Sequence, residues 1–188
     1  YTRKTFGPER YDIWTMQSAY HNLPTIGAVQ QLPGAQYAAR SVTHRADSDV
    51  AELSLDIAGA YPVGVLASWR RQIRLDRGMA LTVCDAFELG AQAAGPLAFS
   101  LITACEPHEV TTPATGEGDG TLRLAPGAAP ALQLLWQIPG ATLAVDTLEL
   151  TDARLRRIWG DVLYRLHFTV AQPPRSGQWQ FRFERGTT

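Results

Sequence analysis

The sequence predicts an all-β protein in which two antiparallel sheets form a β-sandwich built from many short strands. In several segments apolar and polar residues alternate with a period of two, the pattern of a strand with one buried face. Turn-forming residues separate these segments at fairly regular intervals. Strand and helix patterns do not alternate along the chain, so a parallel sheet is excluded.

The chain opens with a polar arm at residues 1–12, where Gly7-Pro8 favours a loop. Residues 106–120 are rich in Pro, Thr and Gly and predict an excursion loop. A two-turn helix is an alternative only at residues 151–158. We expect strands at residues 13–16, 23–29, 36–44, 50–58, 69–75, 80–89, 97–105, 121–124, 131–137, 141–150, 155–159, 161–171 and 178–184.

The clearest strand pair comprises residues 69–75 and 80–89. Trp69, Arg71 and Ile73 alternate with polar residues in the first strand. The tight turn that follows ends at Gly78, where a positive φ is expected, so the two strands should form a hairpin.

Asp85 interrupts the apolar face of the second of these strands, between Val83 and Phe87. A carboxylate on a buried face needs a partner, or it must lie at a strand end. Either Arg71 or Arg74 on the neighbouring strand could pair with it. We therefore expect a structural ion pair at Asp85, not a catalytic carboxylate.

Length and charge restrict the class of protein. A chain of 188 residues with 45% apolar residues is enough for one sandwich domain with a sizeable core. The net charge of −1 argues against a nucleic-acid partner or a basic membrane-binding patch. No apolar run reaches the roughly 18 residues of a membrane span. The first residues lack a methionine and an apolar run, so we expect the chain to be cut from a longer protein.

Two cysteines, Cys84 and Cys105, are too few for a disulfide framework. A disulfide would require residues 81–89 and 97–105 to form a hairpin that brings them together, and the alternative is two small buried thiols. No Cys-x-x-Cys spacing predicts a cysteine zinc site. Apart from His21, the histidines are expected to be solvated; they are His44, His108 and His167.

A polar loop with His21-Asn22 lies directly before the expected strand at residues 23–29. This loop, together with Ser18 and the later segment 69–75 leading to Asp85, resembles the His-Asn segment and paired strands of heparinase II/III-like (alginate-lyase-like) polysaccharide lyases. In that family a β-sandwich follows an α-helical toroid. The resemblance implies that residues 1–188 are the C-terminal β-sandwich domain of such a lyase and that the N-terminal toroid precedes Tyr1.

The resemblance also implies roles for residues near the loop. In the full-length protein His21 would complete a zinc site with ligands that lie before Tyr1. A single imidazole cannot hold zinc tightly, so we expect no tightly bound metal in the 188 residues alone. Tyr11, or else Tyr1, is the candidate catalytic acid or base, and the alternative is a surface tyrosine. The candidate substrate-binding residues are Arg10, Tyr20 and Asn22; the residue type of Asn22 also suits a plain turn.

The implied reaction is β-elimination on a uronate-containing glycan, with the toroid and an acidic polysaccharide as partners. The family favours a periplasmic or secreted protein, and a cytoplasmic one stays open. One alternative function is non-catalytic carbohydrate binding, because five Trp and six Tyr residues could stack on sugars. Against it, Trp69, Trp159 and Trp179 lie in expected strands and are assigned to the core. A purely structural sandwich is the other alternative.

Overall fold

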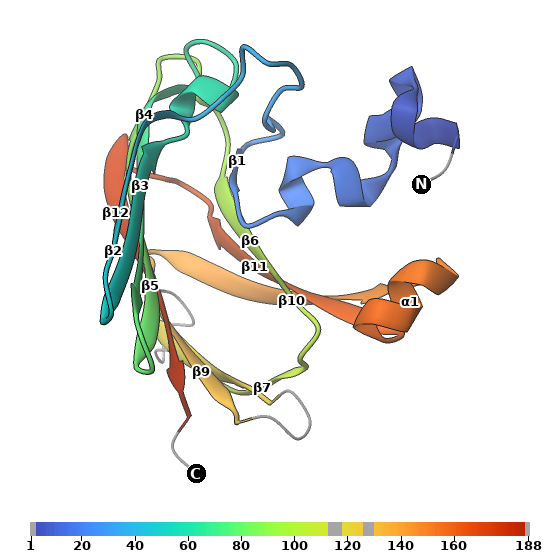
Figure 1. Cartoon of the computed structure of the whole chain (residues 1–188). Coiled ribbons are helices and arrows are strands. Elements are labelled where there is room, and N and C mark those ends of the chain that lie inside the picture. Colours follow the sequence, from blue (N-terminus) through green and yellow to red (C-terminus); the bar gives the residue numbers. More distant parts are fainter. Residues whose placement is uncertain (1–2, 113–117, 126–129, 187–188) are drawn as a thin grey trace.

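The computed structural model describes residues 3–112, 118–125 and 130–186, which form two antiparallel sheets packed face to face (Figure 1). The smaller sheet has the strand order β1-β6-β11-β10, and the larger has the order β2-β3-β4-β5-β12-β9-β8-β7. The strands are β1 (Pro24–Ile26), β2 (Arg40–Ala46), β3 (Val50–Asp56), β4 (Leu66–Asp76), β5 (Ala80–Leu89), β6 (Leu97–Thr103), β7 (Pro107–Thr111), β8 (Gly120–Leu124), β9 (Leu132–Gln137), β10 (Ala141–Glu149), β11 (Val162–Val170) and β12 (Ser176–Arg185). The predicted fold class is confirmed.

Aromatic side chains from both sheets meet in the core. Phe99 of β6 stacks on Phe181 of β12 with 4.8 Å between ring centroids, and Phe168 of β11 meets the edge of the same ring at 5.2 Å. Trp69 and Trp179 are also buried, as predicted. Burial of each such side chain stabilises the fold by about 1.5–3 kcal/mol, so these contacts hold the sheets together.

The hairpin of β4 and β5 forms as expected. Its register runs from Leu66↔Leu89 to Asp76↔Ala80, and Gly78 in the turn has a φ of +75°. A side chain at that φ would strain the backbone, which explains the glycine.

Residues 81–89 and 97–105 do not form the hairpin that a Cys84–Cys105 disulfide would require. β5 belongs to the larger sheet and β6 to the smaller one, and the connection between them crosses from sheet to sheet. Cys84 and Cys105 are free, half-buried thiols. At Gly90, where the crossing begins, an added Cβ would lie 2.0 Å from the carbonyl oxygen of Gly64, so only glycine fits this connection.

Several expected elements differ in the structure. The expected arm and the expected strand at residues 13–16 form three 3-10 helices instead: η1 (Arg3–Phe6), η2 (Pro8–Asp12) and η3 (Trp14–Met16). A fourth, η4 (Ser18–Tyr20), follows directly, and from here on the arm denotes residues 3–22, which include all four. The strand expected at 23–29 is limited to β1, because the chain turns at Gly27 with a φ of +58°. The predicted loop at 106–120 contains β7, and its residues 113–117 lie outside the described part.

The strand expected at residues 155–159 is also wrong, and the helical alternative is confirmed. Helix α1 (Ala153–Trp159) begins at Asp152, whose side chain accepts hydrogen bonds from the backbone N–H groups of Arg154 and Leu155. A further 3-10 turn, η5 (Ala58–Ala60), follows β3. No helix in the described ranges is long and apolar enough to cross a membrane.

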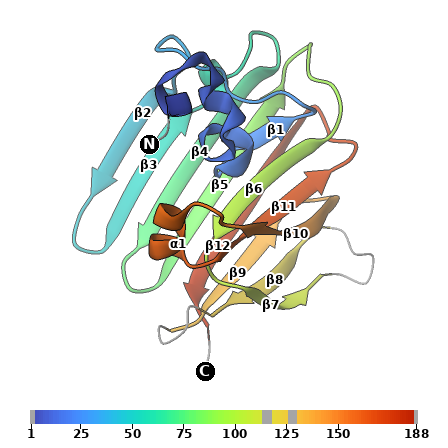
Figure 2. The same cartoon turned by 90° about the vertical axis from the view of Figure 1, so that its right-hand side faces the viewer.

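The four 3-10 helices of the arm and helix α1 lie on the side of the smaller sheet that faces away from the larger sheet (Figures 1 and 2). Helix η4 contacts β6 directly. The arm therefore places the His21-Asn22 loop on the outside of the smaller sheet.

Candidate functional site around His21

His21 is exposed and lies between η4 and β1. Its Nε2 is 3.2 Å from the backbone carbonyl oxygen of Thr15. Because a carbonyl can only accept, Nε2 carries the proton in this hydrogen bond, and Nδ1 keeps its lone pair. The contact orients the imidazole and leaves Nδ1 as the nitrogen available to a ligand.

Asn22 is hydrogen-bonded to a residue of the larger sheet. The Nη1 of Arg71 donates to the Asn22 carbonyl oxygen at 2.7 Å, although 49 residues separate them. The Asn22 Oδ1 accepts a longer hydrogen bond, 3.4 Å, from the backbone N–H of Ile102 on β6. The loop is therefore attached to both sheets.

Arg71 is itself fixed by a buried ion pair with Asp85. Its Nε donates to Oδ1 at 2.7 Å and its Nη2 to Oδ2 at 2.6 Å, a bidentate geometry. The Asp85 side chain is only 1% exposed, and the Arg71 guanidinium also lies 5.2 Å from the centroid of the Phe99 ring. The predicted structural pair is confirmed with Arg71, whereas Arg74 pairs with Asp76 and Glu52.

Two further contacts fix the ends of the loop. Gln30 Oε1 accepts a hydrogen bond from the backbone N–H of Ala19 at 3.0 Å, and Ser18 Oγ accepts one from the backbone N–H of Gln31 at 3.0 Å.

Tyr61 is buried, and its hydroxyl donates to the carbonyl oxygen of Pro24 at 2.6 Å. Burial raises the pKa of Tyr61 well above its ordinary value, so the hydroxyl keeps its proton and this hydrogen bond.

His21 lines two neighbouring hollows. One, of about 620 Å³, is also lined by Tyr11. The other, of about 350 Å³, is also lined by Tyr20, Asn22 and Trp159. The fold therefore brings three of the other four candidate residues, Tyr11, Tyr20 and Asn22, around the His21 imidazole, and Arg10 is the exception.

Arg10 lies beside this group and not in it. Its guanidinium carbon is 5.4 Å from the centroid of the Tyr11 ring. Tyr11 is 41% exposed, so its ring is open to a ligand on its other sides. The alternative candidate, Tyr1, lies outside the described residues.

Tyr20 is an anchor as well as a lining residue. The Arg165 guanidinium carbon is 4.7 Å from its ring centroid, and Arg165 in turn pairs with Asp146 of β10. Trp14 meets Tyr20 edge to face with 5.2 Å between centroids. These contacts attach the arm to the outer face of the smaller sheet.

Two predictions near this site are corrected by the structure. Trp159 is 52% exposed, because it ends α1 on the outer side of the smaller sheet and not in the core. His167 is half-buried and not simply solvated, and burial lowers its pKa. His44 and His108 are exposed, as expected.

The described residues offer zinc one ligand at this site. His21 has the orientation of a metal-binding histidine, because ligating imidazoles usually donate their other N–H to a carbonyl or carboxylate. No group of three or more His, Cys, Asp or Glu side chains suited to a metal occurs in ranges 3–112, 118–125 and 130–186. A structural zinc site needs about four ligands, so these residues do not form one by themselves.

The fold and its attached arm define an antiparallel two-sheet β-sandwich. No family model matches the chain, and no curated protein matches it. Solved structures do match, among them the heparan sulfate lyase HepC from Pedobacter heparinus, with a TM-score of 0.65 and 13% identity over 95% of this chain and 26% of that one.

Two heparinase III structures also match. One, with methylated lysines, has a TM-score of 0.65 and 12% identity over 97% of this chain. The other has a TM-score of 0.62 and 15% identity over 100% of this chain. The resemblance to heparinase II/III-like lyases is thus confirmed at the level of the fold, and the chain spans about a quarter of the length of these structures.

Proposed function

We propose that the chain is the C-terminal β-sandwich domain of a polysaccharide lyase that cleaves uronate-containing glycans by β-elimination. The observation that carries this proposal is the likeness of 95–100% of the chain to three heparinase structures. In this proposal the His21 loop forms one wall of the substrate cleft, and an N-terminal α-toroid forms the other.

The chemistry requires three functions at the sugar. The C5 carboxylate is neutralised, a base removes the C5 proton, and an acid protonates the departing O4. Tyr11 and His21 share one hollow, so the Tyr11 hydroxyl is our candidate for an acid or base from this chain. Asn22 and Tyr20 line the adjoining hollow, where they would contact substrate, and Arg10 would contact it beside Tyr11.

His21 is also our candidate zinc ligand in the full-length protein. The fixed Nε2–H contact with Thr15 supports this role, because it leaves Nδ1 for a metal. The other ligands would come from outside the described residues. Zinc would supply rigidity to the loops beside the cleft.

The first test is activity of the full-length protein on heparan sulfate, unsulfated heparosan and alginate, measured as unsaturated uronates that absorb in the ultraviolet. We expect such products from at least one of these glycans. No unsaturated product from any of them would contradict the proposal.

The second test compares His21→Ala with His44→Ala in the full-length protein. His44 is an exposed histidine of β2 on the larger sheet, so it is a matched control. We expect His21→Ala to lower bound zinc and activity and His44→Ala to change neither. Stoichiometric zinc in the His21 variant, or no zinc in the unsubstituted protein, would exclude the metal role.

A further inference from the structure

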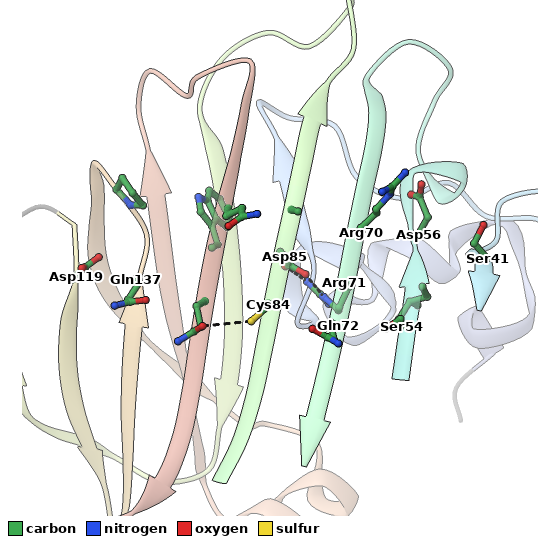
Figure 3. Close-up of a pocket in the computed structure, with 16 residues that line it drawn as sticks. Ser41, Ser54, Asp56, Arg70, Arg71, Gln72, Cys84, Asp85, Asp119 and Gln137 are labelled. Atoms are coloured by element: carbon green, nitrogen blue, oxygen red, sulfur yellow. Dashed lines mark hydrogen bonds and ion pairs between the residues drawn. The ribbon is translucent and has the colours of Figure 1, made fainter. Parts of the chain in front are cut away.

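A row of uncharged polar side chains crosses the larger sheet on the face that points away from the core. Strand register places one such residue on each of six adjacent strands: Thr43, Ser54, Gln72, Cys84, Gln180 and Gln137. Four of them, Ser54, Gln72, Cys84 and Gln137, lie at one level across the strands in Figure 3. We call these six residues the amide row.

A hollow of about 840 Å³ lies over five of the six residues of the amide row, all but Thr43 at its edge. The hollow is deepest at its centre, because Cys84 and the neighbouring Ala86 have small side chains there and the longer side chains of Gln72 and Gln180 flank them. This volume is in the range of about 300–1,000 Å³ found for ligand sites in proteins. Figure 1 shows the arm on the opposite side of the sandwich from the outer face of the larger sheet. Because His21 follows η4 at the end of this arm, the sheets separate it from the hollow.

The amide row contrasts with the next row along the same face. There Arg74 pairs with Glu52 and Asp76, and Arg182 pairs with Glu184, so the charges neutralise one another. In the amide row the one hydrogen bond between row members is a long contact of 3.5 Å from Cys84 Sγ to Gln180 Oε1. At the rim of the hollow, Arg70 makes no ion pair with any residue of the described part. Gln72 also makes a side-chain hydrogen bond to Glu52 of the next row. Each glutamine amide has two N–H donors and an oxygen acceptor, so the three amides of the row retain donors and acceptors for a ligand.

We propose that the amide row is a second glycan-binding site, which holds a linear oligosaccharide across the strands of the larger sheet. Sugar hydroxyls both donate and accept, and so do the amide groups of glutamine. Adjacent strands are about 4.8 Å apart, close to the length of one sugar ring along a glycan chain, so successive rings would each meet a side chain of a new strand. Arg70 at the rim can pair with a glycan carboxylate, but Asp56 and Asp119 also line the hollow, so its charge is mixed and the site does not require a charged glycan.

This site does not depend on lyase activity. It would hold the polymer at a distance from His21, which would keep a long substrate attached between successive cleavages. A failure of the proposed reaction would leave the amide row as a binding surface, and the test below reads binding directly at that surface.

The free thiol of Cys84 provides the test, with Cys105 as an internal control in the same protein. The full-length protein is treated with a maleimide at mildly alkaline pH, with and without a heparosan octasaccharide or cellohexaose. Peptide mass spectrometry then measures the labelling rate at each cysteine. We expect at least one of these glycans to slow labelling of Cys84 about tenfold at saturation and to leave Cys105 unchanged.

Substitutions in the row complete the test. Gln72→Leu with Gln180→Leu should weaken protection of Cys84 about tenfold or more, because each removes a hydrogen-bonding group. Gln133→Leu is the matched control, since Gln133 lies on the same face of β9 as Gln137 but outside the hollow. Equal slowing at both cysteines, no slowing with either glycan, or a Cys84 that does not react even without glycan would overturn the proposal. The last result would show that another part of the protein covers this face.

Discussion

At the scale of single residues, the Arg71–Asp85 pair connects the core to the His21-Asn22 loop. The charges are almost completely buried, and the guanidinium donates three hydrogen bonds that fix its position, two to the Asp85 carboxylate and one to the Asn22 carbonyl oxygen. Buried pairs of this kind stabilise a particular conformation more than they stabilise the folded state overall. Here the conformation that they fix is that of the His21-Asn22 loop.

We predict that Asp85→Ala destabilises the protein by about 3–5 kcal/mol, because it leaves a buried guanidinium without its carboxylate. Removing both charges, by Arg71→Met with Asp85→Leu, should cost much less in the free energy of unfolding. Urea unfolding measures both variants. Asp161→Ala, which breaks the exposed pair with Arg156, is the control and should change little. If Asp85→Ala lowers the free energy of unfolding by no more than Asp161→Ala does, the buried pair is not essential for stability.

Sequence reasoning could predict part of this network. An aspartate between Val83 and Phe87 on an apolar face implied a partner, and the paired strand offered arginines. The contact between Arg71 and Asn22 gave no signal, since it joins segments 49 residues apart and depends on how the sheets stack. The sequence also gave no signal for the amide row, because its residues are aligned only by the register of six strands.

Tyr61 gives a prediction for alkaline pH. Burial raises its pKa in the folded protein, and the nearby Arg71 offsets this only in part. In the unfolded chain tyrosine loses its proton near pH 10. The stabilisation from Tyr61 is therefore fully present below about pH 10 and is lost as the pH rises toward the folded-state pKa. In urea unfolding at several pH values, Tyr61→Phe should be less stable than the unsubstituted protein at neutral pH and lose less stability above pH 10. Tyr11→Phe, at an exposed tyrosine, should keep the original pH profile.

At the scale of elements, the arm shows why local patterns failed. Ile13, Trp14 and Met16 have the composition of a strand, but no neighbouring strand pairs with them, and their backbone forms hydrogen bonds within successive 3-10 turns. The end of helix α1 was more readable. Standard helix signals are present at both ends: Asp152 as the N-cap, Arg156 and Arg157 in the last turn, and Gly160 after it. The prediction of a strand at residues 155–159 gave these signals less weight than the alternation of apolar residues.

We predict that Tyr20→Ala detaches the arm from the smaller sheet. The substitution removes the ring that contacts Arg165 and Trp14, and the cation–π contact alone is worth about 0.5–1 kcal/mol. Hydrogen exchange should speed up in residues 3–22 and stay unchanged in the core strands β5 and β12. Tyr11→Ala serves as the control, because Tyr11 has no such contact with the sheet. Equal exchange in both variants would show that other contacts hold the arm.

At the scale of the whole molecule, alternation predicted a sandwich but not the sheet to which each strand belongs. A strand of either sheet has one apolar and one polar face, so β5 and β6 look alike in sequence although they lie in different sheets. The fold also gives the two outer faces different surroundings. The outer face of the smaller sheet contacts the arm and carries the His21 loop, and that of the larger sheet carries the amide row.

This arrangement leads to a prediction about activity. The chain spans about a quarter of the heparinase structures that it matches, and it offers one imidazole and one exposed tyrosine to the proposed reaction. A β-elimination site divided between two domains loses the positioning of its groups when one domain is absent, and such positioning is worth several orders of magnitude in rate. We therefore expect residues 1–188 alone to fold, with a far-ultraviolet spectrum dominated by strand, and to release no unsaturated uronates from a glycan that the full-length protein cleaves. The spectrum is the control for folding. Clear lyase activity from the folded 188 residues would show that the complete catalytic site lies in this sandwich.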